Sequence, residues 1–241
     1  MSSVKKHYGQ LLSDIYSWMS GGFETGIRRN TEFFNKHGLS PKGSGVAVDL
    51  GAGCGFQSIP LAKAGYSVTA IDLDPKLIHE LKEQSKDLGI TTVQGDLLDF
   101  DQTINSGAEL IVCMTDTILH LESKKKVTSL FSKIFSALEP GGKFILTFRD
   151  LTYELADTDR FLPVKNDENI ILTCFLEYEP DTVKVHDLVY KKIDGEWTFY
   201  KSFYRKLRLS QKWIIEQLSQ SGFKKTEESV ENGCITIICS K

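Results

Sequence analysis

The feature that most constrains this chain is an apolar run that ends beside an acidic residue and passes directly into a glycine-rich turn. The run and its turn are Val46–Leu50, Gly51, Gly53 and Gly55. A helical pattern follows over residues 56–64. A strand, a glycine loop and a helix in this order bring backbone N–H groups close to a ligand at the helix N-terminus. The sequence therefore predicts a ligand-binding α/β unit.

Two details of the loop argue against a dinucleotide as that ligand. The fingerprint G-x-G-x-x-G needs a third glycine where this chain has Phe56. Asp49 stands at the mouth of the loop, where a carboxylate would repel a pyrophosphate and attract an ammonium or a sulfonium. These details favour S-adenosylmethionine (SAM), a nucleoside with a cationic amino-acid tail and no phosphates.

Three more strands are predicted, and each ends in polar residues. The strands and the residues that follow them are 66–71 with Asp72, 91–94 with Asp96 and Leu97, and 109–114 with Thr115 and Asp116. Asp72 lies 21 residues after Gly51, near the usual spacing of an acidic residue that binds ribose hydroxyls. Helical patterns alternate with these strands, and Asp74 and Ser210 are expected as helix caps. Such alternation predicts a parallel sheet with right-handed crossovers.

The ordered motifs over residues 43–150 resemble those of the class I SAM-dependent methyltransferases. They read D-L-G-A-G-C-G, A-I-D-L-D, G-D-L-L and L-E-P-G-G-K-F-I-L. The resemblance implies an α/β fold with a Rossmann-like seven-stranded sheet. Two final strands, residues 223–229 and 234–240, are similar to the antiparallel hairpin that ends this sheet in the family.

After Asp150 the sequence becomes rich in β-branched and aromatic residues, which predicts an antiparallel insertion of three strands. The strands are expected at 170–178, 182–193 and 196–207, with Asp194-Gly195 as a hairpin turn. This insertion resembles that of glycine and amino-sugar N-methyltransferases. The expected domains are an N-terminal helical lid at 1–40, a SAM-binding domain at 41–162 and 208–241, and the β insertion at 163–207.

The resemblance also assigns the cofactor site. It implies that Asp72, with Leu73 beside it, binds the ribose diol, that Asp96 and Leu97 contact the adenine, and that the remaining residues surround the methionine part: Asp49, Gly51, Gly53, Gly55, Met114 and Thr115. Plainer alternatives are that Asp72 caps a helix, that Asp96 is a solvated loop residue and that Met114 belongs to the core. Tyr16, Trp18 and Phe23 form either an aromatic lid over the cofactor or a helix packed on the sheet.

The methyl acceptor is expected near the ends of the fourth and fifth strands. His120 there can act as a base near neutral pH or simply pack at a helix start. Arg149 can bind an anionic acceptor group or pair with Asp150, and Asp116 is a further candidate base. The sulfonium is a strong electrophile, so catalysis needs in-line alignment and exclusion of water more than covalent chemistry.

Composition narrows the partners. The net charge of −3 gives no bulk attraction to nucleic acid or anionic membrane, and no apolar run approaches a membrane span. The five cysteines form neither a C-x-x-C pair nor a metal-ligand spacing, so no metal site is expected. The first residues lack a signal-peptide pattern, and the cysteines are expected to be reduced, so a cytoplasmic location is expected.

The sequence thus predicts a SAM-dependent methyltransferase that acts on an N or O atom of a small molecule and releases S-adenosylhomocysteine. Residues 114–117 lack the proline and the aromatic residue of the DNA amino-methyltransferase motif, which disfavours nucleic acid. The alternatives are a nucleotide-dependent oxidoreductase on a similar sheet and a non-catalytic SAM-binding protein. A homodimer through the inserted sheet is also expected, because an exposed strand edge needs covering.

Overall fold

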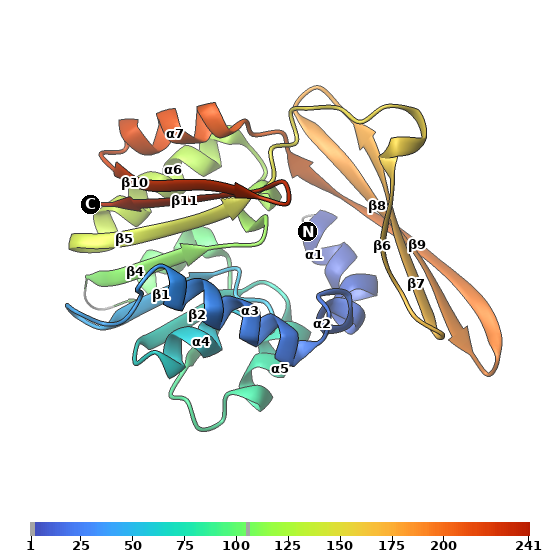
Figure 1. Cartoon of the computed structure of the whole chain (residues 1–241), viewed down its shortest axis with the longest axis horizontal. Helices are drawn as coiled ribbons and strands as arrows, with labels where there is room; N and C mark the ends of the chain where they lie inside the picture. Colours follow the sequence, from blue (N-terminus) through green and yellow to red (C-terminus); the bar gives the residue numbers. More distant parts are fainter. Residues whose placement is uncertain (1–2, 105–106) are drawn as a thin grey trace.

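A computed structural model describes residues 3–104 and 107–241 and arranges them as two sheets with an N-terminal helical segment between them (Figure 1). The larger sheet has seven strands in the order β10-β11-β5-β4-β1-β2-β3. Its central pairs are parallel, and β11 runs antiparallel to both β5 and β10. The strands are β1 Val46–Leu50, β2 Ser67–Asp72, β3 Thr91–Gln94, β4 Ala108–Cys113, β5 Leu138–Phe148, β10 Lys224–Glu231 and β11 Cys234–Ser240.

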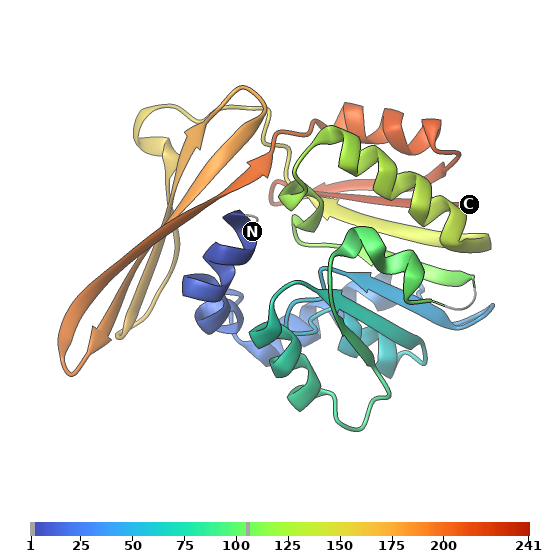
Figure 2. The same ribbon diagram turned by 180° about the vertical axis from the view of Figure 1, so that it is seen from behind.

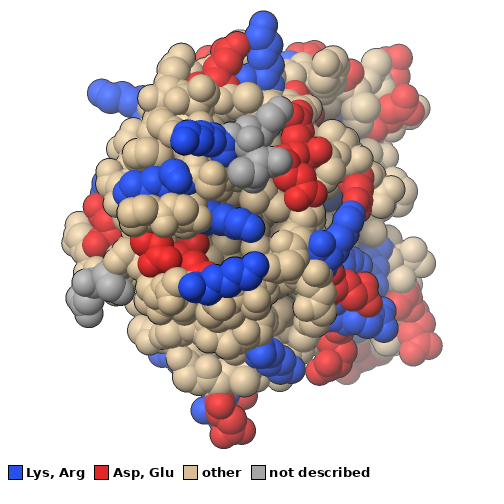
Figure 3. Space-filling model, turned by 60° about the vertical axis from the view of Figure 1, so that its left-hand side comes forward, with Lys and Arg blue, Asp and Glu red and all other residues tan. Residues whose placement is uncertain are grey.

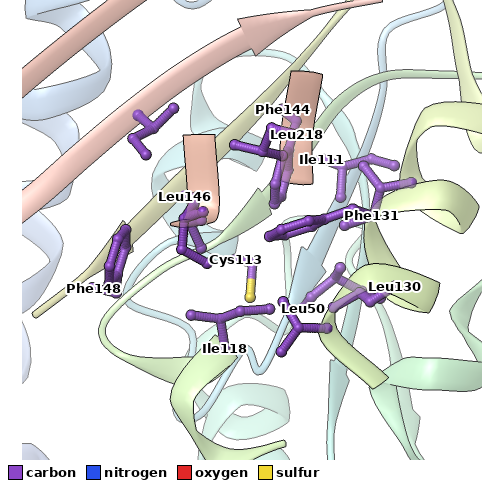
Figure 4. Close-up of a cluster of buried hydrophobic side chains, with 14 of the residues drawn as sticks. Leu50, Ile111, Cys113, Ile118, Leu130, Phe131, Phe144, Leu146, Phe148 and Leu218 are labelled. Carbon is purple, nitrogen blue, oxygen red and sulfur yellow. The ribbon is translucent and has the colours of Figure 1, made fainter. Parts of the chain in front are cut away.

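Helices cover both faces of this sheet. The cover on one face, seen in front in Figure 2, comprises α6 (Lys124–Ala137), α7 (Gln211–Gln220) and the 3₁₀ helix η3 (Leu97–Gln102). The cover on the other face comprises α3 (Phe23–Lys36), α4 (Ser58–Lys63) and α5 (Pro75–Gln84). Phe131 of α6 and Phe144 of β5 lie at the centre of the first layer, and both are fully buried (Figure 4). The predicted seven-stranded α/β fold is confirmed.

Local chemistry explains where the helices begin. The Asp74 carboxylate accepts hydrogen bonds from Lys76 N at 2.9 Å and Leu77 N at 3.1 Å, ahead of α5. Ser210 accepts a hydrogen bond from Trp213 N at 3.2 Å ahead of α7. Both expected caps are confirmed, and each satisfies backbone donors that the first turn of a helix leaves unpaired.

Local signals also set two other element boundaries. α6 begins at Lys124, because Ser123 caps it by accepting a hydrogen bond from Lys126 N. Residues 139–142 lie inside β5 as a bulge, where the pairing with β4 shifts register. Gly141 there has a φ of +79°, which lets the strand bulge and resume its pairing.

The second sheet is wholly antiparallel and has four strands in the order β6-β7-β8-β9. The strands are β6 Phe161–Asn166, β7 Ile170–Tyr178, β8 Thr182–Ile193 and β9 Glu196–Leu207. The three expected strands are present, and β6 is an addition that begins two residues before the expected boundary. β6 was not expected because it contains Pro163, which argues against a strand. Proline is nevertheless tolerated on an edge strand, and β6 lies at the edge of its sheet. Asp194 and Gly195 both have positive φ, as a two-residue hairpin turn requires.

The N-terminal segment fills the space between the two sheets (Figures 1 and 2). It consists of α1 Ser3–His7, the π-helix η1 Tyr8–Leu12, the 3₁₀ helix η2 Ser13–Ile15 and α2 Tyr16–Met19. Leu11, Leu12 and Ile15 are buried against Leu172 and Val189 of the inserted sheet. Two further 3₁₀ helices, η4 Thr117–His120 and η5 Asp157–Arg160, complete the described elements.

Basic and acidic side chains are interspersed over the face of the molecule that Figure 3 presents. No described helix is long and apolar enough to cross a membrane.

Candidate functional site

The glycine loop follows β1 at the carboxyl edge of the seven-stranded sheet. Gly51, Gly53 and Gly55 all have positive φ, between +54° and +97°. A Cβ at Gly51 would collide with the side chain of Thr117, and one at Gly55 would collide with that of Leu81. The loop therefore needs glycine for its backbone conformation and for the close approach of its neighbours.

Asp49 lies beneath this loop rather than at its surface. Its side chain is buried and accepts a hydrogen bond from Ser58 Oγ at 2.6 Å. Burial raises the pKa of this carboxyl to about 7, against the opposing effect of the Ser58 hydroxyl. Asp49 can therefore act on a ligand only through the field it projects across the loop.

One open cleft gathers most of the predicted cofactor residues. Its volume is about 940 Å³ including the space at its mouth. The predicted residues that line it are Gly51, Gly53, Asp72, Leu73, Asp96, Leu97, Thr115 and His120. Asp49, Gly55, Met114, Asp116 and Arg149 do not line it. Met114 packs in the core under β4, as the plainer alternative held.

Asp72 stands on the floor of the cleft. Its two carboxylate oxygens accept hydrogen bonds from Gly53 N and Asp74 N, each at 2.8 Å. Burial raises the pKa of Asp72, and these two amide donors lower it in part. Further along, Asp96 caps η3 by accepting a hydrogen bond from Leu98 N at 2.9 Å. These acceptors can bind a diol and an exocyclic amino group.

The loop after β4 is strained and firmly held. Thr115 and Asp116 have φ values of +59° and +65°, which non-glycine residues rarely adopt. Thr115 N donates a hydrogen bond to Thr147 Oγ1 at 2.7 Å. The Asp116 carboxylate accepts hydrogen bonds from Arg149 N and Nη1, both at 2.8 Å, and from Lys206 Nζ at 2.7 Å. Burial would raise the pKa of Asp116, but the two cations outweigh it and hold that pKa well below its usual range.

His120 ends this loop and faces the cleft. Its ring stacks on Tyr204, with centroids 5.3 Å apart and planes 6° from parallel, and it meets Tyr8 edge-on at 5.9 Å. Burial and the Lys206 ammonium lower the pKa of His120 to about 3. This lies well below the range in which an imidazole acts as a base near neutral pH. Its Nδ1 is buried and has no hydrogen-bond partner among the described residues.

Sequence reasoning did not find several residues of this region. Lys206 arrives from β9, 90 positions after the carboxylate that it contacts. Tyr8 lines the cleft from η1, and Lys126 lines it from α6. Of the proposed aromatic lid, Tyr16 lines the cleft, whereas Trp18 donates a hydrogen bond to Asp167 at 2.5 Å. The aromatic periodicity of the first 20 residues was the one signal available for Tyr8.

Among the described residues, no group of three His, Cys, Asp or Glu side chains is placed to hold a metal ion. The five cysteines are all free.

Comparison with known proteins finds a family that part of this chain resembles. Residues 47–142 match the family described as a methyltransferase domain. Over 139 residues the chain is 27% identical to a glycine/sarcosine N-methyltransferase of Halorhodospira halochloris, covering 57% of this chain and 50% of that one. It is 32% identical over 112 residues to a ubiquinone biosynthesis O-methyltransferase of Xanthomonas axonopodis pv. citri (strain 306), covering 45% of this chain and 44% of the other. The chain thus spans about half the length of the curated relatives it matches.

The solved structures agree on the fold. An amino pentose methyltransferase from Micromonospora echinaspora, determined with bound SAM, superposes with a TM-score of 0.73 over 96% of each chain, at 11% identity. The resemblance therefore extends beyond the matched domain to the N-terminal segment and the inserted sheet.

Proposed function

We propose that this chain, whose residues 47–142 match the family described as a methyltransferase domain, binds SAM in the cleft and transfers its methyl group to an N or O atom of a small molecule. One observation carries the proposal. The glycine loop, the Asp72 carboxylate and the loop after β4 converge on a single cleft at the carboxyl edge of the parallel sheet. SAM would supply an electrophilic methyl group there.

Each part of the cleft suits one part of SAM. Asp72 would bind the ribose hydroxyls, and Asp96 with the N–H of Leu97 would hold the adenine. The glycine loop and Thr115 would surround the methionine portion. Asp49 does not line the cleft. When its carboxyl is ionised, its electric field would still favour a cation over a phosphate in the cleft.

The acceptor would approach from the side of the loop after β4, where the methyl group would point. Tyr8 and Tyr204 enclose His120 there and exclude water. A neutral imidazole can accept a hydrogen bond from an N–H or O–H of the acceptor and so orient its lone pair. Because its pKa is about 3, His120 is a weak base, and its task would be orientation.

An amine is the preferred acceptor. Glycine/sarcosine and amino pentose methyltransferases are both among the similar proteins, although an O-methyltransferase is too. Arg149 supports an acceptor that also carries an anionic group, because its half-exposed side chain has N–H donors beyond the one given to Asp116. Asp116 is paired with the cations of Arg149 and Lys206, so its role would be to position those two side chains rather than to accept a proton.

The domain assignment follows from this function. Residues 1–40 would form the lid, residues 41–162 and 208–241 the SAM-binding domain, and residues 163–207 the cover of the acceptor site. Five free cysteines favour the cytoplasm as the location. The net charge of −3 favours a small-molecule partner over nucleic acid.

We also propose a homodimer through the inserted sheet. Its outer face exposes a row of large apolar side chains, which includes Phe161, Tyr190, Trp197, Phe199 and Phe203, each between 42% and 50% exposed. At about 200 Å² per aromatic side chain, these five expose roughly 450 Å², within the range of about 300–600 Å² for a monomer's largest patch, which is often functional. A second copy packed face to face would cover this patch.

The decisive experiment is calorimetry with SAM, S-adenosylhomocysteine and NADH, followed by a screen of amine and hydroxyl acceptors that scores S-adenosylhomocysteine by mass spectrometry. We expect one SAM site, no NADH binding and turnover with an amine. Binding of NADH without binding of either SAM compound would overturn the proposal. Binding without turnover on any acceptor class would instead favour a non-catalytic SAM-binding protein.

A further inference from the structure

An ion cluster around the buried Asp116 carboxylate joins the inserted sheet to the seven-stranded sheet. Lys206 of β9 places its ammonium 2.7 Å from the Asp116 carboxylate, and Arg149 approaches the same carboxylate at 2.8 Å. The side chains of Asp116 and Lys206 are 4% and 14% exposed. A carboxylate this deeply buried needs a partner, but it is already paired by Arg149 through two hydrogen bonds. The second cation therefore requires a separate explanation.

We propose that Lys206 is a positioning residue of the acceptor site: through Asp116 it clamps the loop that carries His120, and it keeps His120 as a neutral hydrogen-bonding group for the acceptor. This inference rests on the proposed function for its purpose, but not for its geometry. It assigns to the inserted sheet a chemical role in the site in addition to covering it.

The first step of the argument is the loop. Thr115 and Asp116 hold left-handed backbone conformations that are unfavourable for non-glycine residues and persist only where their surroundings impose them. The three hydrogen bonds to the Asp116 carboxylate impose that conformation, and Lys206 supplies the one that comes from outside the seven-stranded sheet. The same loop leads directly into η4, which ends at His120.

The second step is charge. The cluster of Asp116, Arg149 and Lys206 carries one excess positive charge beside the His120 ring. Burial opposes protonation of that ring most strongly, the Lys206 ammonium opposes it next, Asp116 favours it and His7 opposes it. Without Lys206, Asp116 would act on His120 with less opposition.

The third step is the surroundings of the ring. Tyr204 stacks on one side of His120 and also lies 5.9 Å from the Lys206 ammonium, so β9 holds both groups in one arrangement. Tyr8 of η1 closes the edge. Nδ1 is buried and unpartnered among the described residues, so a protonated ring would bury an N–H without a partner. His120 also lines the cleft, and an acceptor N–H or O–H can donate a hydrogen bond to its ring only if the ring is not a cation.

The test is a titration of the histidine ring resonances by NMR in protein with labelled histidine, with His120 assigned from a His120→Gln variant. In the unsubstituted protein we expect the His120 signal to stay nearly constant from pH 8.5 down to pH 4, in line with its low pKa. In Lys206→Met we expect the midpoint to rise by about one pH unit or more, so that the ring is about half protonated near pH 4, because the opposing ammonium is gone. Lys206→Arg should restore the original behaviour.

Lys201→Met is the matched control, since Lys201 lies on the same strand and is exposed. Its titration curve for His120 should match that of the unsubstituted protein. If Lys206→Met fails to fold, Lys206→Gln replaces it, because the amide can still donate to Asp116. An unchanged midpoint in the neutral variant, or an equal shift in the Lys201 variant, would overturn the inference.

Amide hydrogen exchange of residues 115–121 provides the second measurement. We expect exchange to accelerate by about tenfold in Lys206→Met and to return in Lys206→Arg, because the clamp is lost and then restored. Unchanged exchange would contradict the clamp. Calorimetry with S-adenosylhomocysteine separates the two proposals: if no variant binds it, including the unsubstituted protein, the proposed function fails while the titration still judges Lys206.

Discussion

The two sheets of this molecule differ in how far their faces are buried. The seven-stranded sheet is covered by helices on both faces, and its central strands β1, β4 and β5 are almost entirely buried. The inserted sheet is covered on one face only, by the N-terminal segment and the loops near it. Its other face exposes aromatic side chains to solvent.

The two sheets therefore have different roles in the proposed site. The buried sheet fixes backbone positions at its carboxyl edge, where the glycine loop and Asp72 need accuracy. The half-covered sheet contributes side chains from a distance, such as Lys206, and leaves a surface for association. The match to the methyltransferase-domain family, residues 47–142, lies in the first sheet, and we expect the particular acceptor to be set by the second.

The largest expected effect contrasts the two sheets directly. Phe131→Ala removes a fully buried ring, and we expect the free energy of unfolding to fall by about 3–5 kcal/mol. The matched variant Phe199→Ala removes a ring that is 45% exposed on the inserted sheet, and the loss should stay below about 1 kcal/mol. Urea unfolding followed by circular dichroism measures both. Equal losses would show that the inserted sheet is as fully packed as the other.

The second effect concerns the one buried acid under the glycine loop. The pKa of Asp49 is raised from 3.8 to about 7 by burial, so between these values the folded chain holds a proton that the unfolded chain has released. Stability therefore falls as pH rises through this range. Asp49→Asn should remove that dependence. Its free energy of unfolding relative to the unsubstituted protein should therefore rise by about 2–4 kcal/mol as the pH goes from 4 to 8. Unfolding curves at several pH values test this, and parallel curves for both proteins would refute it.

The accuracy of sequence reasoning also differed between the sheets. The seven-stranded sheet was predictable because hydrophobic runs, glycine spacing and caps such as Asp74 are local signals. The three long strands of the insertion were predictable for the same reason. The first strand, β6, was not, because Pro163 argues against a strand unless one knows that it lies at an edge.

The site was predictable in part for a related reason. Residues such as Asp72 follow strands directly, and the ends of parallel strands meet at one edge of the sheet. Lys206 was not predictable, since its contact with Asp116 depends on how the insertion folds back over the site. The lowered pKa of His120 was not predictable either, because it is caused by burial and by Lys206, a cation far away in the sequence.

The third effect tests whether the buried sheet is where the cofactor binds. Asp72→Ala should weaken SAM or S-adenosylhomocysteine binding by about 1.5–3 kcal/mol, the range for hydrogen bonds to a charged group. Asp99→Ala is the control, because Asp99 is exposed and lies outside the cleft. Calorimetry should find its affinity unchanged. Equal affinity in the Asp72 variant would place the ribose contact elsewhere.

The smallest effect on the folded monomer is expected on the outer face of the inserted sheet. Phe203 stands in a row of rings across the four strands, 5.3 Å from His186, and is 42% exposed. Phe203→Ser should change the free energy of unfolding of the monomer by about 0.5–1 kcal/mol, because the ring already contacts water. If a second copy covers this row, the same change should weaken dimerisation by about tenfold or more, since aromatic side chains at the centre of an interface dominate its energy.

Val230→Ser gives the comparison that this prediction needs. Val230 is 57% exposed, but it lies on β10 of the other sheet, so its loss should leave the association unaltered. Sedimentation at micromolar concentration distinguishes the two variants. A monomer at every concentration would show that the aromatic face has no second copy as its partner, and equal effects of both variants would place the contact elsewhere. A selective effect of Phe203→Ser would instead extend the contrast between the sheets to assembly, because the face left bare by folding would be the one used to associate.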